Sequence, residues 1–190
     1  MHIEKNISLK PYNTFGIDVS AEYFAAFSST DELKILLEEN KNNNKLIIGG
    51  GSNILFTKNV EGIVLKNELN GIELIKEDEN HFYVKAKGGE VWYEFVLHCI
   101  KNNYAGVENL SLIPGCVGAS PMQNIGAYGV ELKDVFYELE ALHTADLSVH
   151  TFNNKDCNFG YRESIFKRRF KNQFIILNVT FRVDKHPRFN

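Results

Sequence analysis

Residues 113–129 read IPGCVGASPMQNIGAYG and carry no charged side chain. The stretch holds two of the four prolines of the chain and four of its fourteen glycines. Glycine permits unusual backbone dihedrals, and backbone N–H groups that are not used in secondary structure can surround an anion. We therefore interpret residues 113–129 as a loop that binds a large phosphate-bearing ligand. A Gly/Pro cluster that only reverses the chain is the simpler alternative.

A second glycine cluster, Gly49-Gly50-Gly51-Ser52-Asn53, follows a short apolar run over residues 45–48. The cluster does not match the GxGxxG dinucleotide fingerprint, and no P-loop lysine follows it. Its three glycines can still bring N–H groups to a pyrophosphate, while the serine and asparagine add side-chain donors. A flexible hairpin that binds nothing explains the same residues equally well.

The residues that precede this cluster predict a small α/β lobe. Residues 8–16 have the composition of an extended arm, and residues 23–27 that of a strand. Ser29 to Glu32 has capping-box spacing, and a helix with three leucines on its buried side should follow. Strand, helix, strand and glycine loop together indicate a lobe whose strand end presents a ligand loop. The three leucines are Leu33, Leu36 and Leu37.

After the small lobe the pattern changes to short β-rich runs separated by turn residues. Residues 72–75 and 82–86 are predicted to pair antiparallel, residues 135–142 and 149–152 to form a hairpin, and residues 174–183 to form a central strand. Five apolar side chains have the i, i+3, i+4, i+7, i+8 spacing of one helix face that covers the sheet. They are Trp92, Phe95, Val96, Cys99 and Ile100.

These patterns predict an α+β protein with two lobes. The small α/β lobe is assigned to residues 1–60, and the larger, mainly antiparallel lobe to residues 61–190. A hydrophobic content of 44% and a charged content of 24% are ordinary for a folded globular protein.

Charge and cysteine content exclude several classes of protein. A formal net charge of -3 argues against a general nucleic-acid binder, and the one basic cluster, residues 167–171, is read as a solvated surface. No apolar run reaches the length of a membrane span, and the start lacks a signal-peptide core, so we expect a cytoplasmic protein. Three scattered cysteines favour reduced thiols, and no metal-ligand spacing is present. No oligomeric state follows from the sequence.

Four motifs, taken in order, resemble the UDP-N-acetylenolpyruvoylglucosamine reductase (MurB) family: NTF at residues 13–15, GGGSN at 49–53, the stretch 113–131, and FGYRES at 159–164. The resemblance covers almost the whole chain. It implies an FAD-binding domain of the vanillyl-alcohol oxidase or p-cresol methylhydroxylase type, in a bacterial enzyme of peptidoglycan synthesis, and thus of cell wall biogenesis, cell shape and cell division. In that family NADPH reduces the flavin, and hydride then passes to the enol ether of UDP-GlcNAc-enolpyruvate to give UDP-N-acetylmuramate. The implied partner is a small nucleotide sugar and not a nucleic acid or a membrane.

The resemblance also implies which residues act. The catalytic arginine of the family maps onto Arg162, which with Tyr161 would bind substrate; a guanidinium can hold the substrate carboxylate bidentately and stabilise the charge that builds on it. Glu163 and Ser164 would shape that site or serve the fold. The FAD-binding positions map onto Asn13, Thr14, Gly49, Gly50, Gly51, Ser52, Asn53, Pro114, Gly115, Val117, Gly118, Ala119, Ser120, Gln123, Asn124, Gly126 and Ala127.

One departure from the family affects the expected activity. The family has a further C-terminal substrate-binding domain, which supplies a serine as general acid and a glutamate that partners the arginine, and residue 190 lies where that domain should begin. We therefore expect this chain to be part of a longer protein, to bind FAD, and to reduce the enolpyruvyl substrate very poorly alone. Two other functions stay open: a flavoprotein of the same fold that oxidises an alcohol or 2-hydroxy acid, and a noncatalytic nucleotide-binding module.

Overall fold

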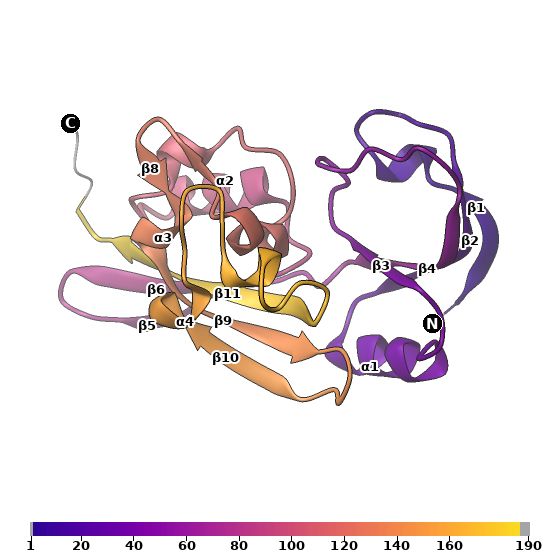
Figure 1. Cartoon of the computed structure of the whole chain (residues 1–190). Coiled ribbons are helices and arrows are strands. Elements are labelled where there is room, and N and C mark those ends of the chain that lie inside the picture. Colours follow the sequence, from indigo (N-terminus) through magenta and orange to yellow (C-terminus); the bar gives the residue numbers. More distant parts are fainter. Residues whose placement is uncertain (1, 187–190) are drawn as a thin grey trace. The chain divides into compact units, whose positions relative to one another are not determined.

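The computed structural model describes residues 2–186 and divides into two compact units, Met1–Leu69 and Asn70–Asn190 (Figure 1). The boundary therefore falls after residue 69 and not after residue 60. The reason is strand β4 (Val60–Asn67), which pairs in parallel with both β2 (Ser20–Phe27) and β3 (Lys45–Ile48). Parallel partners lie far apart in sequence, so the local β-rich pattern of β4 did not reveal which sheet it joins.

The first unit contains a four-stranded sheet in the order β1-β2-β4-β3. Its outer strand β1 (Glu4–Ser8) pairs antiparallel with β2, and a single 3-10 turn, η1 (Lys10–Tyr12), follows it. The sequence did not predict β1, and the expected extended arm is interrupted by η1. β1 is largely exposed and carries no alternating apolar pattern, which explains why its residues gave no strand signal.

Helix α1 (Thr30–Glu39) begins as the capping spacing predicted. The Ser29 hydroxyl accepts the Glu32 N–H at 3.2 Å, and the Glu32 carboxylate accepts the N–H of Ser28, one residue earlier than in a standard box, at 2.7 Å. The bonds that the Ser28 N–H and hydroxyl donate to the carboxylate stabilise its ionised form and lower the pKa of Glu32, with the Ser28 backbone bond as the largest cause. All three predicted leucines are buried: Leu33, Leu36 and Leu37.

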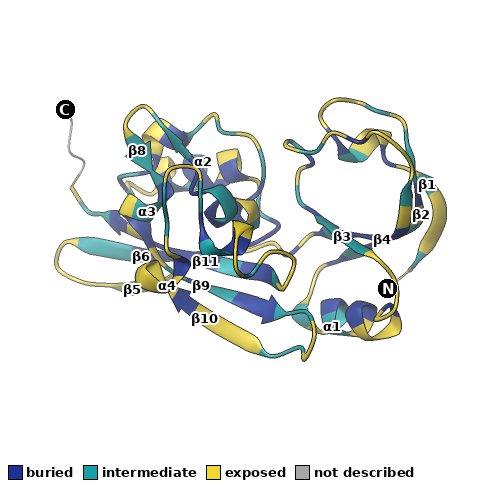
Figure 2. Cartoon of the chain, in the orientation of Figure 1, coloured by how far each residue is buried: buried dark blue, intermediate teal, exposed yellow. Residues whose placement is uncertain are grey.

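The second unit is built on a five-stranded antiparallel sheet in the order β10-β9-β11-β6-β5. The predicted central strand is β11, which is mostly buried, whereas the edge strand β10 is mostly exposed (Figure 2). Ile72 lies opposite Ala86, so the predicted antiparallel pair is also confirmed. The strands are β5 (Ile72–Glu77), β6 (His81–Lys87), β9 (Phe136–His143), β10 (Val149–Asn153) and β11 (Phe174–Asp184).

Short helices and turns complete the second unit, and the longest of them, α2, covers one face of the sheet (Figure 1). No helix among the described residues is long and apolar enough to cross a membrane. The elements are α2 (Trp92–Lys101), η2 (Glu108–Leu110), η3 (Val117–Ala119), η4 (Pro121–Gln123), β7 (Gly126–Ala127), β8 (Val130–Glu131), α3 (Leu132–Val135), α4 (Asn154–Cys157) and η5 (Ile165–Lys167).

Aromatic rings join α2 to the sheet. The ring centroids of Phe95 and Phe181 are 4.5 Å apart, and those of Trp92 and Phe181 are 5.8 Å apart. The indole N–H of Trp92 donates to the Leu110 carbonyl at 2.7 Å, so this buried polar atom is satisfied. Four of the five residues predicted for the buried face are buried, but Ile100 is 47% exposed, because it lies at the edge of the face that the other four form.

Replacing Trp92 with alanine should destabilise the second unit by roughly 3–5 kcal/mol, because the change leaves a large cavity and an unpaired carbonyl. The matched control is Tyr93→Ala on the exposed side of the same helix turn, which should cost less than about 1 kcal/mol. Urea unfolding followed by circular dichroism measures both. Equal losses for the two variants would contradict this description of the core.

The three cysteines are buried, and none forms a disulfide. Burial disfavours the charged thiolate and raises the pKa of Cys99 and of Cys157 to about 12. Because the thiolate is the reactive form, a thiol reagent at pH 8 should modify these two residues at least ~100-fold more slowly in the folded protein than in urea. Prompt modification of either residue in the native protein, mapped by mass spectrometry, would show that its environment is more open than described.

Candidate functional site

The stretch 113–129 folds into two 3-10 turns, η3 and η4, and the first strand and the turn of the small hairpin β7–β8. Two backbone bonds dock it on the segment before α2: Val117 N–H donates to the Glu90 carbonyl at 2.8 Å, and Gly118 N–H to the Gly88 carbonyl at 2.9 Å. A Cβ on Gly118 would lie 2.9 Å from the Gly88 oxygen, a distance that real Cβ atoms essentially never show. Glycine is therefore required here for close packing of two backbone segments.

Much of the hydrogen-bonding capacity of this loop is used inside the unit, which corrects the expectation of many free N–H groups. A compact series of tight turns satisfies its own donors, because a buried N–H without a partner is costly. By contrast, the N–H groups of Gly115, Tyr128 and Gly129 make no backbone bond within residues 2–186. The internally bonded donors are the N–H groups of Val117, Gly118, Ala119, Ser120, Asn124 and Ile125.

Asn124 connects this loop to two other segments. Its side chain is fully buried, and its amide donates to the Gly160 carbonyl and accepts the N–H of Lys133, both at 3.0 Å. Asn124 also ends η4 in the left-handed region, with φ of 42°, which asparagine tolerates better than most residues. Of the predicted FAD-binding side chains, Ser120 likewise bonds internally, to the Val117 carbonyl at 2.7 Å. The Gln123 amide makes no hydrogen bond within the described part of the chain.

Arg162 lies in a tight turn that packs on the same loop. Gly160 and Glu163 close the turn with reciprocal backbone bonds of 3.0 and 3.2 Å. Arg162 has a φ of 53°, a left-handed conformation that costs an L-residue about 1 kcal/mol or more. Its guanidinium donates to the Gly126 carbonyl at 2.6 Å, and because the residue is exposed its other N–H groups face solvent. The turn thus holds the Arg162 guanidinium, with its several N–H donors, beside β7.

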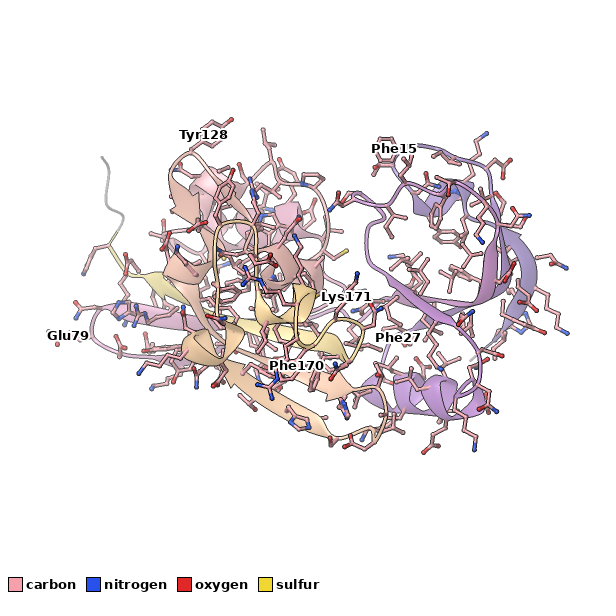
Figure 3. All side chains as sticks on the ribbon, in the orientation of Figure 1. Phe15, Phe27, Glu79, Tyr128, Phe170 and Lys171 are labelled. Atoms are coloured by element: carbon pink, nitrogen blue, oxygen red, sulfur yellow. The ribbon has the colours of Figure 1, made fainter. Side chains whose placement is uncertain are left out.

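Two tyrosines project from this region. Tyr161, in the Arg162 turn, is 85% exposed. Tyr128, between β7 and β8, is 87% exposed and is labelled in Figure 3. Such exposed aromatic side chains close to an arginine give the surface both apolar and cationic character. The arrangement suits an anionic ligand that also carries a ring or an alkene.

Ser164 has a structural role. It is buried, its hydroxyl donates to the Met122 carbonyl at 2.6 Å, and its oxygen accepts the Phe166 N–H at 3.2 Å. The hydroxyl proton is therefore used to join the Arg162 turn to η4. Glu163 pairs through Oε2 with Arg168 Nε at 3.2 Å, and its Oε1 is buried with no hydrogen-bond partner.

In the first unit, Gly51 lies against the segment that contains Asn13 and Thr14. A Cβ on Gly51 would lie 2.0 Å from the Tyr12 carbonyl oxygen, and its φ is +63°, so both space and conformation require glycine. Thr14 N–H donates to the Gly51 carbonyl at 3.2 Å. The Asn13 amide is occupied by Leu9 and Ile17, with bonds of 2.7 to 3.0 Å, so its side chain shapes the turn.

The N–H groups of residues 49–53 provide a test of whether a phosphate ligand fits this loop. Within residues 2–186 none of the five donates to another backbone group, although Gly51 is buried. Buried N–H groups in native proteins are nearly always paired. A row of unpaired donors in a loop of glycines, serine and asparagine fits the pyrophosphate of a dinucleotide, because each N–H can contact an anionic oxygen.

The structure thus brings the predicted residues together in two sets. Asn13 and Thr14 meet Gly51 in the first unit, and Arg162 meets Gly126 in the second. Sequence reasoning missed Gly88 and Met122, whose carbonyls anchor the second set; the adjacent glycines Gly88 and Gly89 are a signal that could have indicated close packing of two backbone segments there. No cluster of three or more metal-ligating side chains occurs within the described residues.

Asn124→Ala should destabilise the second unit by roughly 2–4 kcal/mol, because it leaves the Gly160 carbonyl and the Lys133 N–H without partners. The neighbouring change Gln123→Ala removes an amide with no such bonds and should cost less than about 1 kcal/mol. Chemical denaturation of both variants gives the comparison. A loss for Asn124→Ala no larger than for Gln123→Ala would show that Asn124 does not join these segments.

Comparison with known proteins gives consistent matches. The family model described as FAD binding domain matches residues 21–153. A curated UDP-N-acetylenolpyruvoylglucosamine reductase from Flavobacterium johnsoniae is 52% identical over 97% of this chain. This chain spans 55% of that relative, so it covers about half the length of the curated relatives it matches.

Solved structures confirm the predicted fold type. The crystal structure of UDP-N-acetylenolpyruvylglucosamine reductase (MurB) from Thermus caldophilus superimposes with a TM-score of 0.77 at 23% identity, over 98% of this chain and 64% of that one. That of p-cresol methylhydroxylase with substrate bound gives 0.60 at 15% identity, over 94% and 38%. At these sequence identities the structural similarity shows the fold alone.

Proposed function

This chain belongs to the family described as FAD binding domain, and from that premise we propose that it binds FAD through residues 49–53 and 114–127. The observation that carries the proposal is the row of unpaired N–H groups at Gly49 to Asn53. These donors are suited to the pyrophosphate, and Ser52 and Asn53 add side-chain donors. In the second unit, fewer backbone N–H groups are available to a ligand. There the shape of the loop and the side-chain amide of Gln123 would contribute more to FAD binding.

The proposed activity is that of the curated relatives, the reduction of UDP-GlcNAc-enolpyruvate to UDP-N-acetylmuramate with NADPH as the electron donor. When bound, FAD would supply the hydride that adds to the substrate alkene. Arg162 would bind the carboxylate next to that alkene and stabilise the negative charge that builds on it. Tyr161 would contact the same substrate. Reduction also needs a proton at the second alkene carbon, and Ser164 is not assigned this role because its hydroxyl is bonded to Met122.

The proposed activity would belong to peptidoglycan synthesis, with associated roles in cell wall biogenesis, cell shape and cell division. Its nucleotide-sugar substrate would be met in the cytoplasm. The identity of 52% to a curated reductase supports the proposed activity.

The cofactor proposal is tested by FAD titration. Asn53→Asp should weaken FAD binding by about tenfold or more, because two like charges about 4 Å apart repel by ~1 kcal/mol even in water and the pyrophosphate carries two. The matched control is Asn59→Asp in the same unit, which makes the same charge change and keeps an acceptor for Ser20 N–H. Quenching of flavin fluorescence gives both dissociation constants. Wild-type protein that binds no FAD, or equal effects of the two changes, would refute the proposed loop.

The visible spectrum separates the alternatives. A yellow protein whose flavin is bleached by NADPH without any alcohol supports the reductase. Bleaching by an alcohol or a 2-hydroxy acid, and not by NADPH, would identify an oxidase or dehydrogenase of the same fold. A protein that stays colourless after incubation with FAD would be a nucleotide-binding module of another kind.

A further inference from the structure

We propose that Lys167 is a positioning residue for Arg162, an inference that rests on the proposed role of Arg162 in carboxylate binding. The ammonium group of Lys167 donates to the backbone carbonyl of Arg162 at 2.9 Å. Lys167 is the last residue of η5, five residues after Arg162. It therefore acts on the backbone that determines where the Arg162 side chain points.

The Arg162 turn needs such support. A left-handed φ is sparsely populated by residues with a side chain and persists only where the surroundings hold it. Relaxation to the right-handed region would redirect the Cα–Cβ bond and break the 2.6 Å bond from the guanidinium to Gly126. A charged ammonium is a strong donor to a carbonyl, so the Lys167 bond favours the left-handed state.

The backbone from which the Lys167 side chain extends is itself held in place. Phe166 next to it is almost fully buried, and its N–H donates to the Ser164 hydroxyl, which in turn bonds Met122. Lys167 thus reaches the Arg162 carbonyl from a rigid turn that is anchored to the same loop as the guanidinium. Preorganisation of this kind lowers the entropy cost of holding a long side chain in place.

The neighbouring cationic side chains do not contact the Arg162 carbonyl. Arg168 pairs with Glu163, and the Arg169 guanidinium lies 5.4 Å from the ring centroid of Phe170. The side chain of Lys171, labelled in Figure 3, makes no hydrogen bond or ion pair within residues 2–186, although its backbone N–H donates to the Arg168 carbonyl. Lys171 is therefore a matched control, since its replacement removes the same charge from the same exposed segment.

The experiment compares Lys167→Met, Lys167→Gln, Lys167→Arg and Lys171→Met with the wild-type chain. The first readout is the side-chain N–H signal of Arg162 in NMR spectra of isotope-labelled arginine, assigned by its loss in Arg162→Lys. We expect Lys167→Met and Lys167→Gln to mobilise this signal, Lys167→Arg to restore its order, and Lys171→Met to leave it unchanged. The proposal would be overturned if the Arg162 signal were as ordered in Lys167→Met and Lys167→Gln as it is in the wild type.

The second readout is affinity for the enolpyruvyl nucleotide sugar beside affinity for FAD. Lys167→Met should weaken binding of the sugar by about fivefold or more, as expected for loss of a charged hydrogen bond that positions the anion site, and leave FAD binding within about twofold. The proposed function would be refuted instead if the wild-type protein did not bind the sugar, or if the Arg162→Lys variant bound it as tightly as the wild type does. The NMR readout decides on Lys167 in either case, because it requires no ligand.

Discussion

Gly118 approaches the carbonyl of Gly88 so closely that no other residue fits between the two backbones. This contact fixes η3 on the segment that leads into α2, and the following turns place Asn124 and Gly126 where the Arg162 turn can bond to them. A single substitution that forced the two backbones apart would move every one of these contacts together. The position of the exposed guanidinium thus depends on backbone packing more than on its own side-chain bond.

The two glycine loops satisfy their backbone groups in different ways. Residues 49–53 leave their N–H groups without backbone partners, whereas η3, η4 and the residues that flank them use most of theirs internally. An unpaired donor can bind an anion, while a paired donor can only support the shape of the loop that carries it. The first loop is accordingly suited to hold phosphate, and the second to hold neighbouring side chains in fixed positions. Similar sequence composition therefore does not imply a similar role.

Local patterns predicted much of this fold. Capping spacing predicted α1, β-rich runs separated by turn residues predicted the β5–β6 pair, and helical spacing predicted α2 with its core residues. The sequence could not reveal the parallel pairing of β4, because it depends on contacts between distant residues, and it also did not predict the short 3-10 turn after β1 or the exposure of Ile100. Within the site, Arg162 was recognised through its motif, but its bonds to Gly126 and Lys167 required coordinates, because they join turns that have no periodic pattern.

The distribution of donors also bears on which steps this chain can support. The groups suited to FAD are backbone atoms whose positions follow from the fold of each unit, so cofactor binding should persist wherever the units fold. Substrate reduction instead needs side chains, and those exposed in this region include Arg162, Tyr161 and Tyr128. The hydroxyl of Ser164, in the same turn as Arg162, is bonded to a carbonyl and buried. The proposed cofactor binding and the proposed turnover therefore depend on different groups of this chain.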